Sequence, residues 1–220
     1  MYYLTVIELV TFFTGVLTWK VIGPRRLRWV TVILGVTALN ESLLVPLAEK
    51  YHLGNQNVLY NAFSLVDMCV WLYLFYLAPG SRLYRWLVLA ASDILVVYSL
   101  YELCVQTGWK RMHVNSFRVY ELAVILCAVY YIRGLLQKDY HNLTTDFFFW
   151  CCAACIVYHG LLFLNFTTMA EHNYWKLKNA VDIFFILQDV AGICYYLLLC
   201  TGFLMFFLKS RVSKTSSPKL

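Results

Sequence analysis

Carboxyl, amide, hydroxyl and imidazole side chains occur inside stretches of this sequence that are otherwise apolar. Ten of them form a candidate site: Asn40, Glu41, Asn61, Ser64, Asp67, Glu102, His159, Asp182, Gln188 and Asp189. Ionisable groups inside a lipid bilayer are costly, and those that persist usually face a bundle interior or a water-filled cavity. The sequence therefore predicts that these residues bind a small ligand, a cation or a proton.

Acidic residues outnumber basic residues inside the apolar stretches. Eight acids lie inside the runs, and Arg118 is the basic residue expected to pair with one of them: Glu8, Glu41, Asp67, Asp93, Glu102, Glu121, Asp182 and Asp189. They cannot all be buried and ionised, because burial disfavours the charged form of a carboxyl group. This favours proton-coupled transport, cation binding or recognition of an amine. The alternative is that each carboxyl group makes one interhelical hydrogen bond, worth about 0.6 kcal/mol, and only fixes packing.

One pair among these residues is predicted to be structural. Arg118 and Glu121 are three residues apart, so they lie on the same helical face and can form an ion pair there.

Seven apolar runs must position these side chains. The chain has 220 residues, of which 61% are hydrophobic and 14% charged, whereas a soluble domain carries about 25% charged residues. Because about 20 apolar residues cross a bilayer as a helix, we expect an all-α polytopic membrane protein with seven transmembrane helices. The runs are 2–19, 29–48, 58–78, 84–106, 116–133, 147–168 and 179–208.

The runs form a single transmembrane domain over residues 1–208, and residues 209–220 are expected to be a basic, disordered cytoplasmic tail. The first run has no basic segment before it and no small-residue cleavage site after it, which indicates a retained span and not a signal peptide.

Basic residues predict the orientation of the helices. Twelve of the 18 lysine and arginine residues follow the first, third, fifth and seventh runs. Since basic residues accumulate on the cytoplasmic side, the N-terminus is expected outside and the C-terminus in the cytoplasm. The net charge of +6 is explained by this rule and by a tail that can touch anionic lipid, so no nucleic acid partner is expected.

In this orientation the polar residues map to the outer half or the middle of their runs. We therefore expect an outward-facing polar pocket, with Glu41, Asp67, His159 and Asp189 as its walls. This geometry favours a sensor or receptor-like subunit that signals through a membrane partner or a cytoplasmic partner. A transporter or channel is the alternative, a lipid-modifying enzyme is a second one, and the chain could form a homo-oligomer.

No cofactor is expected. Seven-span membrane hydrolases of the ceramidase and progestin-receptor-like type bind zinc through three histidines with a serine and an aspartate. Ser64, Asp67 and His159 match part of that set, but run 179–208 contains no histidine, and zinc needs three or four ligands. A rhodopsin would need a lysine deep in the last run, and Lys178 lies at its outer edge. All eight cysteines fall inside the runs, where they are expected to serve as packing residues.

Two motifs carry a resemblance to known proteins. Asn40-Glu41 occurs in the second run, and Leu59-Tyr60-Asn61 leads into the acidic third run. In these motifs and in its layout the chain resembles small uncharacterised seven-span bacterial membrane proteins. The resemblance covers the second and third runs and the topology. It implies a multi-pass protein of the bacterial inner membrane and implies no activity.

Overall fold

The computed structural model describes residues 2–20, 28–51, 56–78, 80–109, 111–137, 143–169 and 178–215. Within these ranges the chain is helical and contains no strand. The helical segments are α1 (Tyr2–Thr18), α2 (Arg28–Leu39), η2 (Asn40–Leu44), α3 (Val45–Lys50), α4 (Gln56–Leu77), α5 (Arg82–Tyr101), η3 (Glu102–Gln106), α6 (Val114–Leu136), η4 (Leu143–Thr145), α7 (Phe147–Met169) and α8 (Lys178–Thr215).

The seven predicted apolar runs coincide with helical stretches, and six of these are long and apolar enough to cross a membrane. They are Arg28–Ala48, Asn57–Leu77, Arg82–Gln106, Val114–Leu136, Phe147–Thr168 and Phe185–Arg211. The remaining apolar helix, Tyr3–Thr18, is shorter. At 1.5 Å per residue it measures about 24 Å, against about 30 Å of hydrocarbon. A seventh crossing and the orientation of the bundle therefore stay predictions.

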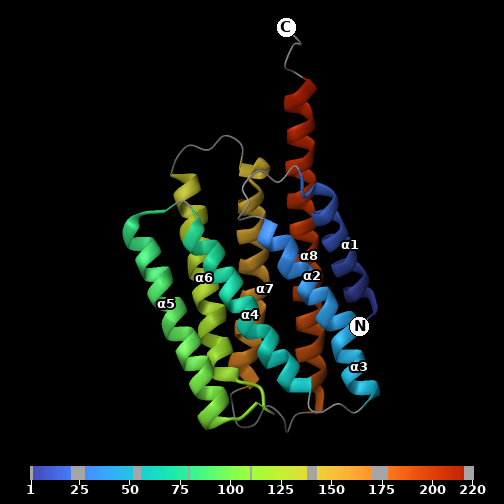
Figure 1. Ribbon diagram of the computed structural model, residues 1–220, viewed down its shortest axis with the longest axis vertical. Helices are drawn as coiled ribbons and strands as arrows, with labels where there is room; N and C mark the ends of the chain where they lie inside the picture. Colours follow the sequence, from blue (N-terminus) through green and yellow to red (C-terminus); the bar gives the residue numbers. More distant parts are fainter. Residues whose placement is uncertain are drawn as a thin grey trace.

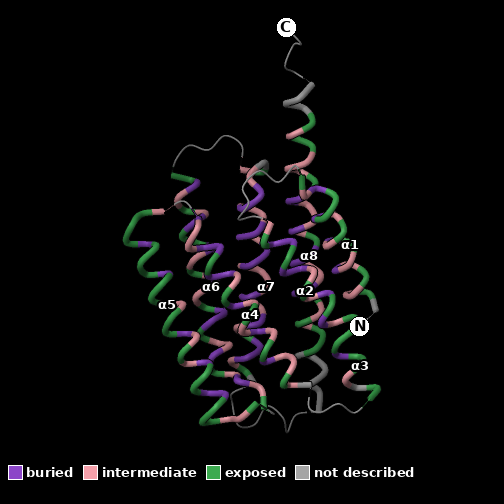
Figure 2. Tube along the Cα trace, in the orientation of Figure 1, coloured by how far each residue is buried: buried purple, intermediate pink, exposed green. Residues whose placement is uncertain are grey.

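The long helices run roughly antiparallel in one bundle (Figure 1). Helix α7 packs against α6 and α8, and α1 packs against α8 and α2. Helix α5 lies at the edge of the bundle and packs on α4 and α6 (Figure 1). The buried core runs along the middle of the bundle (Figure 2) and is rich in aromatic side chains, as at Trp71, Phe75 and Phe203. Cys151, Cys152 and Cys155 are buried in it as free thiols.

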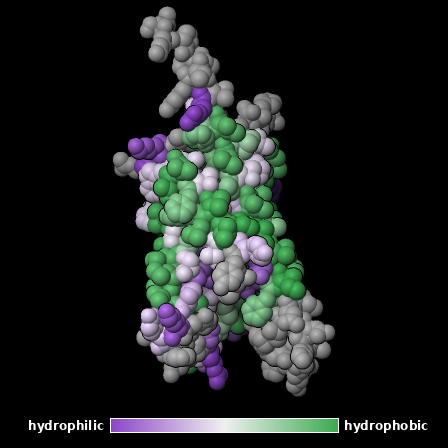
Figure 3. Space-filling view, turned by 90° about the vertical axis from the view of Figure 1, so that its right-hand side faces the viewer, coloured by the Kyte–Doolittle hydropathy of each residue, from purple (hydrophilic) through white to green (hydrophobic). Residues whose placement is uncertain are grey.

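The outer surface of the bundle is apolar over most of its height. Figure 3 shows hydrophobic side chains covering the middle of one face, with hydrophilic residues toward both ends. Large side chains such as Leu17, Leu83 and Ile94 are 68–81% exposed. An apolar surface of this extent is stable against lipid and unstable against water. The architecture is that of an integral multi-pass membrane protein.

The helical segment that contains Pro46 continues past this residue. The chain passes from α2 through a π-helical turn, η2, into α3, and the backbone N–H group of Val45 donates to the carbonyl group of Asn40, five residues earlier. Pro46 lacks an N–H group and would crowd the carbonyl group four residues before it in a regular α-helix. The wider turn relieves this crowding, so the helix continues to Lys50.

Helix α8 is longer than the seventh predicted run. It continues to Thr215, and its end projects beyond the bundle (Figure 1). Residues 209–215, predicted as part of a disordered tail, are therefore helical. The reason is that no glycine or proline follows Leu208 until Pro218, so the helix meets no breaker there. Residues 216–220 lie outside the described part of the chain.

Candidate functional site

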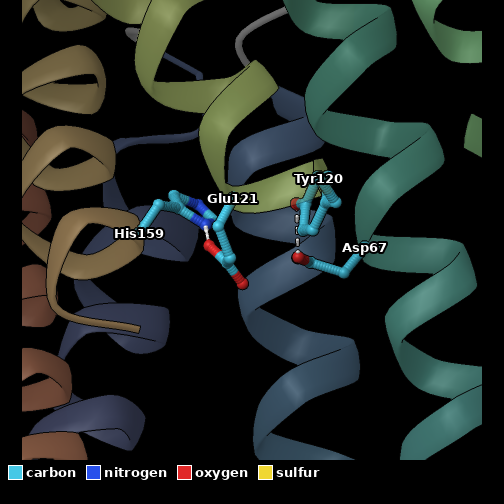
Figure 4. A network of polar contacts seen from close by, with 4 residues as sticks. All are labelled: Asp67, Tyr120, Glu121 and His159. Atoms are coloured by element: carbon cyan, nitrogen blue, oxygen red, sulfur yellow. Dashed lines mark hydrogen bonds and ion pairs between the residues drawn. The ribbon is translucent and has the colours of Figure 1, made fainter. Parts of the chain in front are cut away.

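The interior of the bundle holds four polar side chains from three helices, which we call the Asp67 cluster: Asp67 on α4, Tyr120 and Glu121 on α6, and His159 on α7 (Figure 4). The hydroxyl group of Tyr120 donates a hydrogen bond of 2.8 Å to Oδ2 of Asp67. Oε2 of Glu121 pairs with Nδ1 of His159. Tyr120, Glu121 and His159 are 1–3% exposed and Asp67 is half-buried, so most of the cluster lies inside the bundle.

The position of α6 between α4 and α7 brings the cluster together. Successive residues of an α-helix point about 100° apart, so the adjacent Tyr120 and Glu121 address different neighbours. Figure 4 shows Tyr120 directed toward Asp67 and Glu121 directed toward His159. Helix α6 therefore supplies one hydrogen-bonding side chain to α4 and one to α7.

The two halves of the cluster are also in contact with each other. The ring of His159 packs edge-on against the ring of Tyr120, with the centroids 5.5 Å apart. Asp67 lies within electrostatic range of both His159 and Glu121. Nε2 of His159 has no hydrogen-bond partner among the residues that the structure describes. The cluster thus combines two carboxyl groups, one imidazole and one phenol, and a proton can be shared within each hydrogen-bonded pair.

The predicted ion pair between Arg118 and Glu121 is wrong. Glu121 pairs with His159 on α7, and Nε of Arg118 has no hydrogen-bond partner within the described ranges. Glu121 is 2% exposed and faces the bundle, while Arg118 is only half-buried. On the interior face of α6, Glu121 therefore pairs with His159 of another helix and not with Arg118 of its own helix.

A second acidic group is formed by Glu8 on α1 and Glu41 in η2. Glu8 is 2% exposed, and its carboxyl group lies within hydrogen-bonding range of the Tyr196 hydroxyl group and within electrostatic range of Glu41. The hydroxyl group of Tyr60 donates to Oε2 of Glu41 at 3.5 Å. Asn40, next to Glu41, is buried. The predicted site residues Asn40 and Glu41 therefore lie in a part of the interior that Glu8 shares.

Tyr158 links the two acidic groups. It lies within electrostatic range of Glu8, Glu41, Asp67 and Glu121, which come from α1, η2, α4 and α6. Tyr158 adjoins His159 on α7. Glu8, Tyr120, Tyr158 and Tyr196 were not among the site residues predicted from the sequence. A signal was present in the pairs Tyr120-Glu121 and Tyr158-His159, where a tyrosine adjoins a titratable residue.

Glu102, the first residue of η3, has a different environment, because its carboxylate lies against the start of α6. Its carboxylate accepts hydrogen bonds from the backbone N–H groups of Asn115 at 3.2 Å and Ser116 at 2.7 Å, and from the Ser116 hydroxyl group. A carboxylate stabilises a helix at this point, because the first N–H groups have no partner within the helix. Glu102 thus attaches the connection between η3 and α6 to the bundle.

Asn61 and Ser64 hold the same connection from α4. The amide group of Asn61 donates to the carbonyl oxygens of Trp109 and Arg111 at 3.0 and 2.9 Å. The hydroxyl group of Ser64 donates to the carbonyl group of Asn61 and lies 3.2 Å from Nε2 of His113. Asn61, Ser64 and Glu102 therefore converge at one end of the bundle, in a group separate from the Asp67 cluster.

His113 is the titratable residue beside Asn61, Ser64 and Glu102. It lies between two membrane-spanning segments. Its ring stacks on Phe117 with the centroids 4.4 Å apart. Burial lowers the pKa of His113 from its ordinary value of 6.5 to about 4, although the negative charge of Glu102 acts in the opposite direction. His113 is therefore neutral at pH 7, and its ring nitrogen can take part in a hydrogen bond with Ser64 without a charge.

The three site residues predicted on α8 are not brought to the Asp67 cluster by any contact among the described residues. The side chain of Asp182 lies outside the described part of the structure. Gln188 is exposed and Asp189 is half-buried. Of the four predicted pocket walls, Asp67 and His159 belong to the Asp67 cluster, Glu41 bonds to Tyr60, and Asp189 has no described contact to them.

The partial zinc set is also divided. Ser64 bonds to His113 at one end of the bundle, while Asp67 bonds to Tyr120. In the described residues, no three histidine, cysteine, aspartate or glutamate side chains are placed to share a metal ion.

Two hollows border α6, and neither is lined by Glu41, Asp67 or His159. The one closer to the cluster touches Ser64, His113 and Tyr120 and is too narrow for a water molecule. The wider one, of about 360 Å³, is apolar and lies toward the other end of α6, at Val129, Arg133 and Gln137. The polar residues therefore converge in closely packed surroundings.

No family model, no curated protein and no solved structure matches this chain.

Proposed function

We propose that this multi-pass membrane protein binds a proton at the Asp67 cluster and acts as a sensor or receptor-like subunit. The sequence left three ligand classes open: a small ligand, a cation or a proton. We favour the proton, because its binding requires no cavity. The supporting observation is that α4, α6 and α7 each place a titratable side chain in one buried, hydrogen-bonded group (Figure 4).

The chemistry of the cluster couples protonation to helix packing. An ionised Asp67 accepts the hydrogen bond of Tyr120, whereas a protonated Asp67 can also donate one. In the same way, a proton on His159 gives Glu121 a charged partner, and its loss leaves a neutral ring beside a carboxyl group. Each step changes the attraction between α6 and its neighbours, which is how a bound proton would shift the arrangement of the bundle.

Transport is the second candidate, and one observation favours it. Glu8 and Glu41 are further proton-accepting groups, and Tyr158 lies within electrostatic range of them as well as of Asp67 and Glu121. A series of such groups is typical of intramembrane proton relays. A sensor changes shape with pH without net flux, whereas a transporter moves protons across the bilayer.

Trp71 provides a built-in reporter for the test. It is one turn from Asp67 on α4, its indole faces the Asp67 carboxyl group, and it is 1% exposed. We would measure the pH dependence of tryptophan emission in vesicles containing the purified protein, and subtract the emission of Trp71→Phe. The proposal predicts a sigmoidal change that disappears in Asp67→Asn and in Glu121→Gln.

Asp93→Asn is the matched control, because Asp93 is an exposed acid on α5 that contributes nothing to the cluster. The control should keep the wild-type response. An emission that does not change with pH, or a change that survives in both cluster variants, would refute proton binding. Proton flux that is lost in Glu121→Gln would replace the sensor by the transporter, and turnover of a lipid by the pure protein would replace both by an enzyme.

A further inference from the structure

Asp93 is an acidic residue on the outward-facing side of a membrane-spanning helix. The span Arg82–Gln106 has 25 residues, and Asp93 lies about 16 Å from its first residue and about 20 Å from its last, at 1.5 Å per residue. Its side chain is exposed and makes no hydrogen bond or ion pair with another described residue. Asp93 therefore lies near the centre of the bilayer and faces outward from the bundle.

The side chain of Asp93 cannot reach water from this depth. The hydrocarbon core is about 30 Å thick, so either interface is about 15 Å away. Lysine and arginine can extend long side chains toward an interface, whereas aspartate has only one methylene group. Carboxyl groups at this depth almost always face a protein interior or pair with another residue. The position of Asp93 therefore indicates that something other than lipid covers this face.

The surrounding face of α5 is apolar and exposed. Helix α5 lies at the edge of the bundle, and its outward side is exposed along its length (Figures 1 and 2). Only 28% of its apolar window is buried, against 33–44% in the other five spans. Large exposed side chains lie one and two turns from Asp93 on this side: Trp86, Leu89, Val97 and Leu100.

We propose that this face of α5 binds a transmembrane helix of a partner protein that carries a lysine or arginine at its midpoint, which pairs with Asp93. Charge complementarity decides between this partner and a second copy of the chain. The lysines and arginines described in the six spans lie within five residues of a span end. At the depth of Asp93 a second copy therefore offers another acid and no cation. The proposal does not depend on proton binding at the Asp67 cluster.

A model helix tests the proposal directly. The probe is a synthetic transmembrane peptide of leucine and alanine with one central lysine and a dansyl group, prepared in two versions labelled at opposite ends. The purified full-length protein and the peptide are combined in phosphatidylcholine vesicles. Trp86 is the energy donor, because it is 60% exposed and lies seven residues from Asp93 on the same side of α5. Its contribution is isolated by comparison with Trp86→Phe.

The lysine helix should bind about tenfold more tightly than a helix with a central glutamine, and Asp93→Asn should remove this difference. Ser92→Ala is the matched control and should keep it, because the Ser92 hydroxyl group bonds to the carbonyl group of Val88 within α5. Equal binding of the two peptides, or a preference for lysine that survives in Asp93→Asn, would overturn the proposal. Self-association through Asp93 that the lysine helix does not displace would also overturn it.

Discussion

At the scale of single residues, the hydrogen bond between Tyr120 and Asp67 shows how a carboxyl group is held inside an apolar bundle. Its length of 2.8 Å is typical of a strong O–H···O bond. Tyr120→Phe removes the donor and leaves the buried acceptor unsatisfied, which costs about 1–3 kcal/mol of unfolding free energy. Denaturant unfolding in detergent measures this loss. Tyr101→Phe, the same substitution at a 48% exposed tyrosine, should stay within about 0.5 kcal/mol of wild type.

His113 predicts a pH dependence at the same scale. Its pKa in the folded chain is about 4, below its ordinary value of 6.5. Between these two pH values the unfolded segment binds more protons than the folded one. Acidification therefore weakens the folded connection between η3 and α6. The stabilisation is complete above pH 6.5 and is lost on acidification toward pH 4.

Hydrogen exchange of residues 111–116 measures this effect. After correction for intrinsic rates, protection should fall by up to about tenfold per pH unit across the window. His113→Phe keeps the stack on Phe117 and removes the titration, so its protection should stay flat. A wild-type profile that is equally flat would contradict the assignment.

At the scale of the helices, close packing of α1 depends on Gly15. A Cβ atom there would lie 2.8–2.9 Å from the side chain of Thr31 and 3.0 Å from the ring of Phe203, which belong to α2 and α8. Because Thr31 is buried and β-branched, it cannot move aside easily. Gly15→Ala should cost about 1–3 kcal/mol and loosen α1. Gly160→Ala, where no described atom lies within 4 Å, should be tolerated. Thermal unfolding of the two variants in one detergent makes the comparison.

The helices were predictable from the sequence because their apolar runs are long. The partners of the acidic residues were not, because a run gives the depth of a residue and not the direction in which it points around the helix axis. Spacing favoured Arg118 as the partner of Glu121, but the rotation of α6 directs Glu121 to His159. Glu102 was predicted as a ligand-binding residue, yet the start of α6 folds back onto its carboxylate.

At the scale of the whole molecule, the polar side chains inside the bundle and the exposed acid on its surface support two different proposals. Glu8, Glu41, Asp67 and Glu121, from α1, η2, α4 and α6, lie within electrostatic range of Tyr158, and Asp93 faces outward from α5. The first arrangement supports a proton-binding interior, and the second supports a partner in the bilayer. Together they describe a subunit that would pass a change inside the bundle to a neighbouring membrane protein.

The most direct test of the central claim is the infrared difference spectrum of the reconstituted protein between acidic and neutral pH. The account predicts a carboxylic acid C=O band that appears on acidification, is lost or shifted in Asp67→Asn or Glu121→Gln, and changes position in Tyr120→Phe and His159→Gln. Asp93→Asn should leave that band in place. A spectrum in which no carboxylic acid band depends on Asp67 or Glu121 would contradict proton binding at the cluster.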